Sequence, residues 1–289
     1  KMILVLGATG FLGGYIFDRF KEEAFDVVGT FFDKEKKGTI FFDLSSMSFS
    51  DLNLEKKPSH IIIAAASNPT PEKSVINTEK SYEVNVIRTK EFIDECLEKA
   101  IVPVYFSTDN VFDGKKGNYN EEDETNPLNN YGRMKCEIER HLFASGKPFI
   151  LLRLGKVFKL EMNEPTLFTN MKSGNKLKLA NDQVFTPLYI EDLFQFIKHA
   201  VENNHAGIFH IASCYPTTRY EIANISKNFF NIESIEIIPC SIDDIGLKEP
   251  RPKLIDLDIT KYKKITGKEQ KPIIEFFKKI KIEKNKSQL

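Results

Sequence analysis

Close to its start the chain carries the stretch Leu4-Val5-Leu6-Gly7-Ala8-Thr9-Gly10-Phe11-Leu12-Gly13-Gly14. Its apolar beginning has the pattern of a buried strand, and Ile16, Phe17 and Phe20 follow with the spacing of an amphipathic helix. Glycines between a strand and a helix let the chain turn tightly and let its backbone approach a pyrophosphate, which the helix N-terminus attracts. The glycine spacing differs from the common GxGxxG form, and a turn that merely needs glycines is the alternative, but the flanking strand and helix favour a dinucleotide-binding turn. The expected cofactor contacts are Gly7, Thr9, Gly10, Phe11, Leu12 and Gly13.

Short apolar runs alternate with helical patterns through the first half of the chain. The runs cover residues 2–6, 26–31, 60–65, 102–107 and 149–153. Runs that are apolar on both sides are typical of strands buried in a parallel sheet. Between them, apolar residues recur with helical spacing over residues 75–97 and 130–144. The alternation predicts an α/β fold built on a doubly wound parallel Rossmann sheet with right-handed crossovers.

The regular alternation ends after Gly155. We therefore expect an NAD(P)-binding Rossmann domain over residues 1–155 and a smaller C-terminal α/β substrate-binding lobe mainly over residues 156–289. The patterns in the second part predict a short helix at residues 167–171, short strands at 177–179 and 184–189, and an amphipathic helix at 191–201. After Pro216 they predict a helix, a strand at 235–238 and a helix at 273–280. Residues 208–212 predict a strand that returns to the main sheet.

Charge and composition narrow the classes of partner. Lys plus Arg and Asp plus Glu balance at 41 each, so no global field favours nucleic acid or an anionic membrane. The four cysteines and five histidines are scattered without metal-ligand spacing, so no metal site is expected. The longest apolar run, residues 61–66, is too short to span a bilayer, and no signal-peptide pattern precedes Met2. These features predict a cytoplasmic protein.

The end of the second predicted strand bears on the choice of dinucleotide. NAD-specific sites place Asp or Glu there, where the carboxylate binds the ribose 2′-hydroxyl. Thr30 is expected at this position and is not acidic, and Lys34, Lys36 and Lys37 follow closely. This favours the 2′-phosphate of NADP. The lysines could equally form a solvated loop, so NAD stays open as the cofactor.

Tyr131 and Lys135 are four residues apart in the helix predicted at residues 130–144, which places both side chains on one face. A free tyrosine has a pKa of about 10, too high for easy proton exchange near neutrality. A neighbouring lysine cation favours the phenolate and lowers that pKa, so the hydroxyl can act as a general acid or base. A Tyr-x-x-x-Lys pair is common on helices, and its meaning therefore depends on the motifs around it.

With those motifs the sequence resembles the extended short-chain dehydrogenase/reductase family, and within it the dTDP-4-dehydrorhamnose reductase branch of nucleotide-sugar enzymes. The matching motifs run in order over residues 2–200. They are residues 7–13, Asp43-Leu44, Ala64-Ala65-Ala66, Asn85-Val86, residues 107–114, the spaced set Gly117, Tyr119, Glu121 and Asp123, residues 127–135, Arg153, and Asp182-Gln183.

The resemblance implies a role for each matching residue. Thr108 would hydrogen-bond the reacting carbonyl, Tyr131 would donate its proton, and Lys135 would hold the nicotinamide ribose and tune Tyr131. Further cofactor contacts would be Asp43 and Leu44 at the adenine, Ala64, Ala65 and Ala66 along the dinucleotide, and Asn85, which would brace the active site. The sugar would meet Ser67, Asn68, Thr108, Asn110 and Tyr131, and the C-terminal lobe would supply the nucleotide-diphosphate pocket.

Some positions depart from the family pattern. Asn110 stands where the rhamnose enzymes usually carry tyrosine and where 4,6-dehydratases of the superfamily carry a glutamate base. An amide has no useful basicity, which argues against dehydration. Met134 replaces a small hydroxyl residue, and Lys156 and Phe158 alter the pattern after Arg153, so the pocket for the sugar differs from the family's.

The sequence therefore predicts an NAD(P)H-dependent reductase of a 4-keto-6-deoxy nucleotide sugar, in deoxysugar or polysaccharide biosynthesis. Three alternatives stay open: a nucleotide-sugar epimerase of the same family, a non-catalytic NADP-binding regulatory subunit such as the β subunit of methionine adenosyltransferase, and an NAD(P)-binding redox sensor. The expected partner is a nucleotide-diphosphate sugar, with no nucleic acid and no membrane, and the resemblance suggests a homodimer.

Overall fold

The computed structural model describes residues 1–66, 70–159, 176–232, 235–269 and 271–278 of the 289-residue chain. The chain divides into two compact units, and each is described by itself. The first comprises residues 1–111, 129–153 and 194–209, and the second comprises residues 112–128, 154–193 and 210–289.

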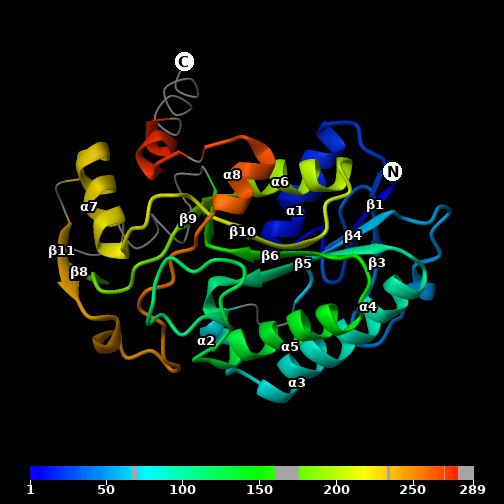
Figure 1. The fold of residues 1–289 in the computed structure, drawn as a ribbon, viewed down its shortest axis with the longest axis horizontal. Helices are drawn as coiled ribbons and strands as arrows, with labels where there is room; N and C mark the ends of the chain where they lie inside the picture. The colour runs from blue at the N-terminus through cyan, green and yellow to red at the C-terminus, as the bar shows by residue number, and fades with distance from the viewer. Residues whose placement is uncertain (67–69, 160–175, 233–234, 270, 279–289) are drawn as a thin grey trace. The chain divides into compact units, whose positions relative to one another are not determined.

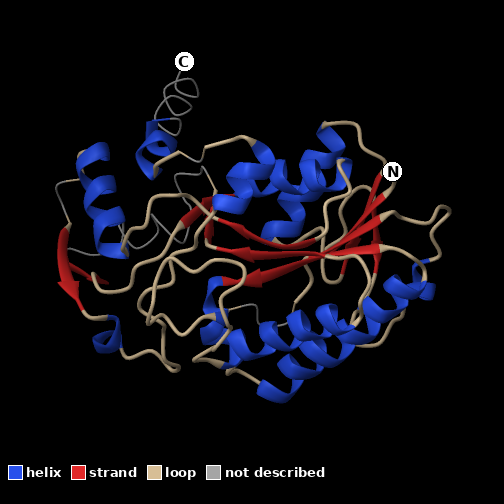
Figure 2. Ribbon diagram, in the orientation of Figure 1, coloured by secondary structure: helices blue, strands red, loops and turns tan. Residues whose placement is uncertain are grey.

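A seven-stranded sheet forms the centre of the first unit (Figures 1 and 2). Its strands are β1 (Ile3–Leu6), β2 (Val27–Phe31), β3 (Thr39–Phe41), β4 (His60–Ile63), β5 (Val102–Thr108), β6 (Ile150–Leu154) and β10 (Gly207–Ile211). They lie in the order β3-β2-β1-β4-β5-β6-β10, and β1 pairs in parallel with β2 and β4, as β2 does with β3 and β4 with β5. The doubly wound α/β fold expected from the sequence is thus confirmed. The strand order reverses between β1 and β4, and in such sheets ligands bind in the crevice at the carboxyl ends of those two strands.

Helices cover both faces of this sheet (Figure 2). In Figure 1, α1 and α6 lie on one side and α4 and α5 on the other. The helical segments of the first unit are α1 (Phe11–Glu22), η1 (Phe49–Leu52), α2 (Pro71–Ser74), α3 (Thr78–Tyr82), η2 (Glu83–Arg88), α4 (Thr89–Glu98), η3 (Asp109–Val111), α5 (Asn130–Ala144) and most of α6 (Ile190–Glu202).

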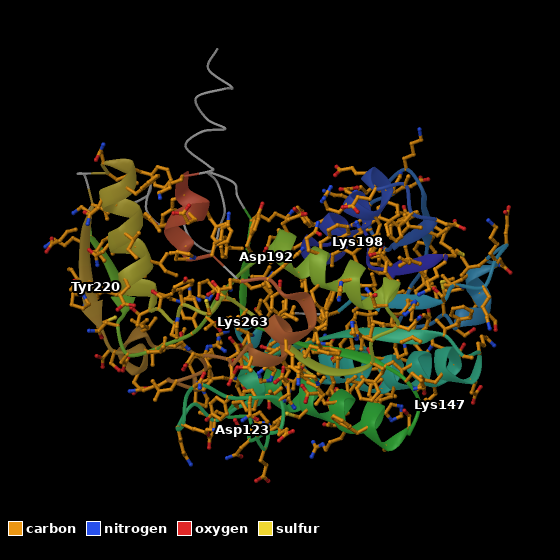
Figure 3. All side chains as sticks on the ribbon, turned by 45° about the horizontal axis from the view of Figure 1, so that its top comes forward. Asp123, Lys147, Asp192, Lys198, Tyr220 and Lys263 are labelled. Carbon is orange, nitrogen blue, oxygen red and sulfur yellow. The ribbon has the colours of Figure 1, made fainter. Side chains whose placement is uncertain are left out.

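Apolar stripes of these helices bury against the sheet and against each other, which is the main source of stability for such a layered fold. Phe20 of α1 and Phe194 of α6 are fully buried with their ring centres 5.0 Å apart. At the surface of the same pair, Lys198, labelled in Figure 3, forms an ion pair with Glu23. On the opposite face, Phe92 of α4 and Leu142 of α5 belong to one apolar core with Leu4 and Ile61 of the sheet.

One predicted helix, at residues 75–97, differs in detail. The chain is interrupted at Asn77, whose φ of 54° lies in the left-handed region and whose side chain accepts a hydrogen bond from the Lys80 N–H, so α3 begins at Thr78. Residues 83–88 then form a π-helical segment before α4. The buried Thr89 hydroxyl donates 2.8 Å to the Val84 carbonyl five residues earlier, which stabilises this wider turn.

The second unit contains smaller sheets than the first. Among its described residues, β7 (Lys156–Phe158) pairs in parallel with β9 (Pro187–Tyr189), and β8 (Lys176–Ala180) pairs in parallel with β11 (Glu236–Cys240). Its helical segments include α7 (Arg219–Phe230), η5 (Ile242–Ile245) and α8 (Thr260–Thr266). Phe158, Phe185, Ile222, Phe276 and Phe277 are among the residues of its apolar core.

The predicted elements of the second half are found in large part. The strand expected at residues 208–212 is β10 of the main sheet, and the helix expected at 191–201 is α6. Of residues 184–189, only 187–189 form a strand, β9, while Val184 and Phe185 make isolated bridges to Leu254 and Thr217. The helix expected at 167–171 and the end of the helix expected at 273–280 lie outside the described residues. Among the helices that the structure describes, none combines the length and apolarity needed to cross a bilayer.

Candidate active site

The glycine turn between β1 and α1 is held by close backbone contacts. Gly7 has a φ of 86°, and a Cβ there would lie 2.9 Å from the Ala65 nitrogen. A Cβ on Gly13 would lie only 2.2 Å from the Gly7 carbonyl oxygen and 3.0 Å from the Ala64 Cβ. No side chain larger than hydrogen fits at either position without backbone movement. The turn and the residues after β4 therefore approach each other at the switch point of the sheet, as expected from the sequence.

Gly10 is the N-cap residue of α1 and places no side chain between the first-turn N–H groups and solvent. Thr9, Gly10 and Phe11 are exposed, Phe11 at 45%. The first N–H groups of a helix and its dipole favour an anion at this point. This cradle fits the pyrophosphate of a dinucleotide, which the first-turn backbone of α1 would hold. Gly7 and Gly10 stabilise the turn below it, because the Gly7 N–H donates to Thr30 and the Gly10 N–H donates to the Gly7 carbonyl.

Thr30 lies in the interior and not at the exposed end of β2. It is 2% exposed, and its hydroxyl accepts a 2.9 Å hydrogen bond from the Gly7 N–H. Its contribution is thus to hold the glycine turn from below. The exposed residues at the end of β2 are Phe32, at 58%, and Asp33. The sequence pattern could not separate these positions because the strand ends one residue beyond Thr30.

Asp43 and Leu44 follow β3. The Asp43 carboxylate accepts hydrogen bonds from the Ser45 N–H at 2.9 Å and from the hydroxyls of Ser45 and Ser46. Leu44 is 6% exposed and belongs to the apolar core of the unit. Both residues therefore shape the loop after β3.

Thr108, Tyr131 and Lys135 come together at the carboxyl end of β5. Thr108 ends that strand, whereas Tyr131 and Lys135 lie on the first two turns of α5. The Tyr131 and Thr108 side chains are hydrogen-bonded. The Lys135 Nζ donates 2.7 Å to the Phe106 carbonyl oxygen and lies 5.8 Å from the centre of the Tyr131 ring. The structure thus assembles the three residues that the sequence singled out.

The electrostatics of the pair depend on burial. Burial, and after it the negative charge of Asp109, raise the pKa of Tyr131, while its hydrogen bond with Thr108 acts in the opposite direction. The lowered tyrosine pKa expected from the neighbouring Lys135 is therefore not found, because burial outweighs it. Burial lowers the pKa of Lys135 to about 8, and the Glu139 carboxylate opposes that shift. Tyr131 is therefore a protonated phenol at neutral pH, which is the form that can give a proton to a developing alkoxide.

Asn110 belongs to a network that reaches the start of α5. Its amide nitrogen donates 2.8 Å to the Asp109 carboxylate, and its carbonyl oxygen accepts from the Asn129 amide at 3.2 Å. The same carboxylate accepts from the Thr108 hydroxyl at 3.1 Å. Asn129 is fully buried and caps α5 by accepting a 2.9 Å hydrogen bond from the Gly132 N–H. The residues before α5 are thereby joined to the end of β5.

Asp109 and Asn129 are site residues that the sequence did not predict. An asparagine immediately before a predicted helix is a recognisable capping signal. Its second bond, to Asn110, depends on the fold and has no local signal. Asn85, expected to brace the site, lies half-buried in the π-helical segment η2 against α5.

Ser67 and Asn68, expected to face the sugar, lie outside the described residues. Ala64 and Ala65 are half-buried beside the glycine turn, and Ala66 is exposed. Among the residues that the structure describes, no three His, Cys, Asp or Glu side chains are grouped so that they could hold a metal ion.

A doubly wound sheet with a glycine turn at its switch point and a Thr-Tyr-Lys group at the end of β5 defines the class of extended short-chain dehydrogenase/reductase folds. The chain belongs to the family described as RmlD substrate binding domain, which matches residues 1–280.

The similar proteins include regulatory-subunit and reductase names. The methionine adenosyltransferase 2 subunit beta of Xenopus tropicalis is 28% identical over 276 residues, covering 92% of this chain and 82% of that protein. A hypothetical dTDP-4-dehydrorhamnose reductase from Sulfolobus tokodaii has a similar structure, with a TM-score of 0.80 and 28% identity over 92% of this chain and 94% of that one. The dTDP-4-dehydrorhamnose reductase of Bacillus anthracis, in complex with NADP, gives a TM-score of 0.85 at 21% identity, covering 98% and 99% of the two chains.

Proposed function

We propose that this protein reduces a 4-keto-6-deoxy nucleotide sugar with NADPH. The observation that carries the proposal is the joining of Thr108, Tyr131 and Lys135 at the carboxyl end of β5, in a sheet whose switch point presents a glycine turn. The names of the Sulfolobus tokodaii and Bacillus anthracis proteins support the same reaction.

The chemistry divides between the cofactor and the side chains. Bound NADPH supplies the hydride for the carbonyl carbon. Tyr131, protonated because it is buried beside Asp109, donates its proton to the carbonyl oxygen. The Thr108 hydroxyl, which donates to Asp109 in this structure, would turn to donate a hydrogen bond to the same oxygen and stabilise the negative charge that develops there. Lys135, fixed by the Phe106 carbonyl, supplies a positive charge beside the phenol that stabilises the tyrosinate left behind.

Asn110 favours reduction over dehydration. Removal of a sugar C5 proton needs a base beside Thr108 and Asp109. The residue there is an amide whose nitrogen is engaged by Asp109 and whose oxygen is engaged by Asn129. The Asn110 amide therefore cannot act as the base, and its two hydrogen bonds fix the positions of Asp109 and Asn129.

We favour NADP over NAD, as in the Bacillus anthracis structure. The lysines after β2 differ in whether an ion pair already holds their side chains. Lys36 forms a 2.7 Å ion pair with Asp18, whereas Lys34 and Lys37 are exposed beyond the end of the strand. An exposed lysine at this place offers a positive charge for a 2′-phosphate. We further propose that the second unit binds the nucleotide part of the substrate.

The test uses purified protein, NADPH or NADH, and a panel of nucleotide-linked 4-keto-6-deoxy sugars. The expected result is substrate-dependent loss of NADPH absorbance and a product reduced at C4, with a smaller rate for NADH. Equilibration of sugar epimers without net loss of NADPH would instead identify an epimerase. Binding of NADPH with no turnover of any sugar would overturn the proposal.

A second candidate is a regulatory subunit, and the identity to the methionine adenosyltransferase 2 subunit beta favours it. The discriminating measurement is co-purification with a methionine adenosyltransferase catalytic subunit together with the sugar assay. A stable complex without sugar turnover supports the regulatory function. Turnover that depends on Tyr131 supports the reductase.

A further inference from the structure

Beneath the catalytic group lies a buried ion pair that the proposed reaction does not use. Glu139 and Arg153 are each 3% exposed. The Arg153 Nη2 donates 2.8 Å to a Glu139 carboxylate oxygen, and its Nε lies 3.2 Å from both oxygens. The desolvation of two buried charges is costly even when they are paired and hydrogen-bonded. A buried pair is therefore weak evidence for stability alone, and its position beside the site calls for an explanation.

The pair joins α5, which carries Tyr131 and Lys135, to the strands beneath it. Glu139 lies one helical turn after Lys135 on α5, and Arg153 lies on β6, the neighbour of β5 in the sheet. The Ser107 hydroxyl, one residue before Thr108, donates to the same Glu139 carboxylate. One carboxylate therefore bonds the end of β5 and β6 from the helix that carries Tyr131 and Lys135.

Lys135 lies between an aromatic ring and the Glu139 carboxylate. Its Nζ lies 4.5 Å from the centre of the buried Tyr105 ring of β5, which offers a favourable π-face but no charge. Burial favours the neutral amine of Lys135, and Glu139 acts against this. The ionisable groups that face this part of α5 are Tyr131, Cys136 and Glu139 on the helix, Tyr105 and Asp109 from β5 and its end, Arg153 from β6, and Lys90 and Tyr82, both bonded to Glu137, from the neighbouring helices.

We propose that Glu139 is a positioning residue for the catalytic group. Through Ser107 and Arg153 it fixes α5 against the end of β5, and its negative charge keeps Lys135 in the ammonium form at neutral pH. Arg153 balances Glu139 and limits how strongly that charge acts. Only the kinetic consequence of this role rests on the proposed function.

The test measures the protonation of Lys135 directly. Wild-type protein is labelled with trace acetic anhydride at a series of pH values, and the acetylation of Lys135 is followed by mass spectrometry against the exposed Lys34 as internal reference. For the wild type we expect a labelling midpoint near pH 8. Glu139→Gln removes the anion and leaves the Arg153 cation, so the midpoint is expected to fall by roughly one pH unit or more.

Two further variants separate charge from packing. Arg153→Gln leaves Glu139 without its balancing cation, so the Lys135 midpoint is expected at or above the wild-type value. The double variant Glu139→Gln with Arg153→Gln removes both charges, avoids an unpaired buried ion, and is expected between the wild type and Glu139→Gln. The double variant keeps the test decisive if Glu139→Gln alone does not fold.

The inference is overturned if the Lys135 labelling midpoint of the double variant equals that of the wild type. Where Glu139→Gln folds, an unchanged midpoint in that variant is also required. In the sugar assay the alkaline limb of kcat/KM is expected to move in the same order as the labelling midpoints. A wild type that turns over no sugar defeats the proposed function and leaves the labelling result able to decide the role of Glu139.

Discussion

The Gly7 backbone N–H donates a 2.9 Å hydrogen bond to the hydroxyl of Thr30. The bond joins the exit of β1 to the last but one residue of β2, below the turn that we assign to the pyrophosphate. Since Thr30 is 2% exposed, water cannot replace the hydroxyl as an acceptor. The conformation of the turn therefore depends on a side chain that does not itself reach the surface.

Replacement of Thr30 by valine tests that dependence. Thr30→Val keeps the shape of the side chain but leaves the Gly7 N–H buried without its acceptor, which costs about 1–3 kcal/mol of stability. We expect a lower free energy of unfolding in urea and weaker NADPH binding by calorimetry. Thr30→Ser keeps the hydroxyl and serves as the control. Equal NADPH affinity in the valine and serine variants would refute the assigned role.

Adjacent glycines of α1 offer a sharper comparison. The Cβ of Gly13→Ala would lie 2.2 Å from the Gly7 oxygen, so the turn must move. The Cβ of Gly14→Ala would meet its nearest atom, the Ala8 oxygen, at an ordinary 3.4 Å. We expect Gly13→Ala to lose NADPH binding by at least tenfold, which corresponds to about 1.4 kcal/mol. Gly14→Ala is expected to bind normally and to gain slightly in stability from its higher helix propensity.

The sequence predicted the glycine turn and the Tyr131–Lys135 pair because each is local. A strand, three glycines and a helix specify a turn within a dozen residues, and a spacing of four on a helix specifies a shared face. The position of Thr30 was not predictable in the same way. Its inward orientation depends on the register Leu4 to Val28 and Val5 to Gly29 between β1 and β2, which no local pattern contains.

Asn129 has two functions that mutation can separate. Asn129→Ser retains a capping oxygen for α5 but is too short to reach Asn110, whereas Asn129→Ala loses both bonds. We expect the alanine variant to lose about 1 kcal/mol of stability and the serine variant much less. Both are expected to lose kcat in the sugar assay by around tenfold, or about 1.4 kcal/mol. A serine variant with wild-type kcat would show that the Asn110 bond has no part in catalysis.

His60 gives a prediction for pH. This residue at the start of β4 is 3% exposed, and its burial, followed by the charges of Lys1, lowers its pKa to about 4. The unfolded state, with a pKa near 6.5, binds the proton more readily, so the stability of the folded state falls as pH is lowered from about 6.5 towards 4. The contribution is on the order of 3 kcal/mol across that window.

Urea unfolding between pH 4 and 7 measures this dependence. His60→Leu removes the titrating group, and its stability is expected to vary less with pH over that range than the wild type's. Replacement of the half-buried His199 by leucine provides the matched control, because that side chain is less deeply buried than His60. Identical pH slopes in wild type and His60→Leu would contradict the assignment.

The relation of Glu139 to Arg153 illustrates what lies beyond sequence reasoning. The sequence marks Arg153 as part of a family motif, and it places Glu139 one helical turn beyond Lys135. Their ion pair forms only because α5 packs across β5 and β6 in one register, which no local pattern contains. The roles of Asp109 and Asn129 were equally unpredictable from the sequence, because their hydrogen-bond partners come from separate elements. Ser67 and Asn68 lie outside the described residues, and their expected contact with the sugar stays a prediction.

The central claim is that Tyr131 and its neighbours direct a hydride to the sugar carbonyl, and isotope transfer tests it most directly. The measurement is the deuterium content at C4 of the sugar after reaction with NADPH deuterated at its transferable position. We predict one deuterium per NADPH consumed in the wild type, and a rate reduced by roughly 10²–10⁴-fold in Tyr131→Phe with NADPH binding retained. NADPH consumption that leaves no deuterium in the sugar, or an unchanged rate in Tyr131→Phe, would contradict the claim.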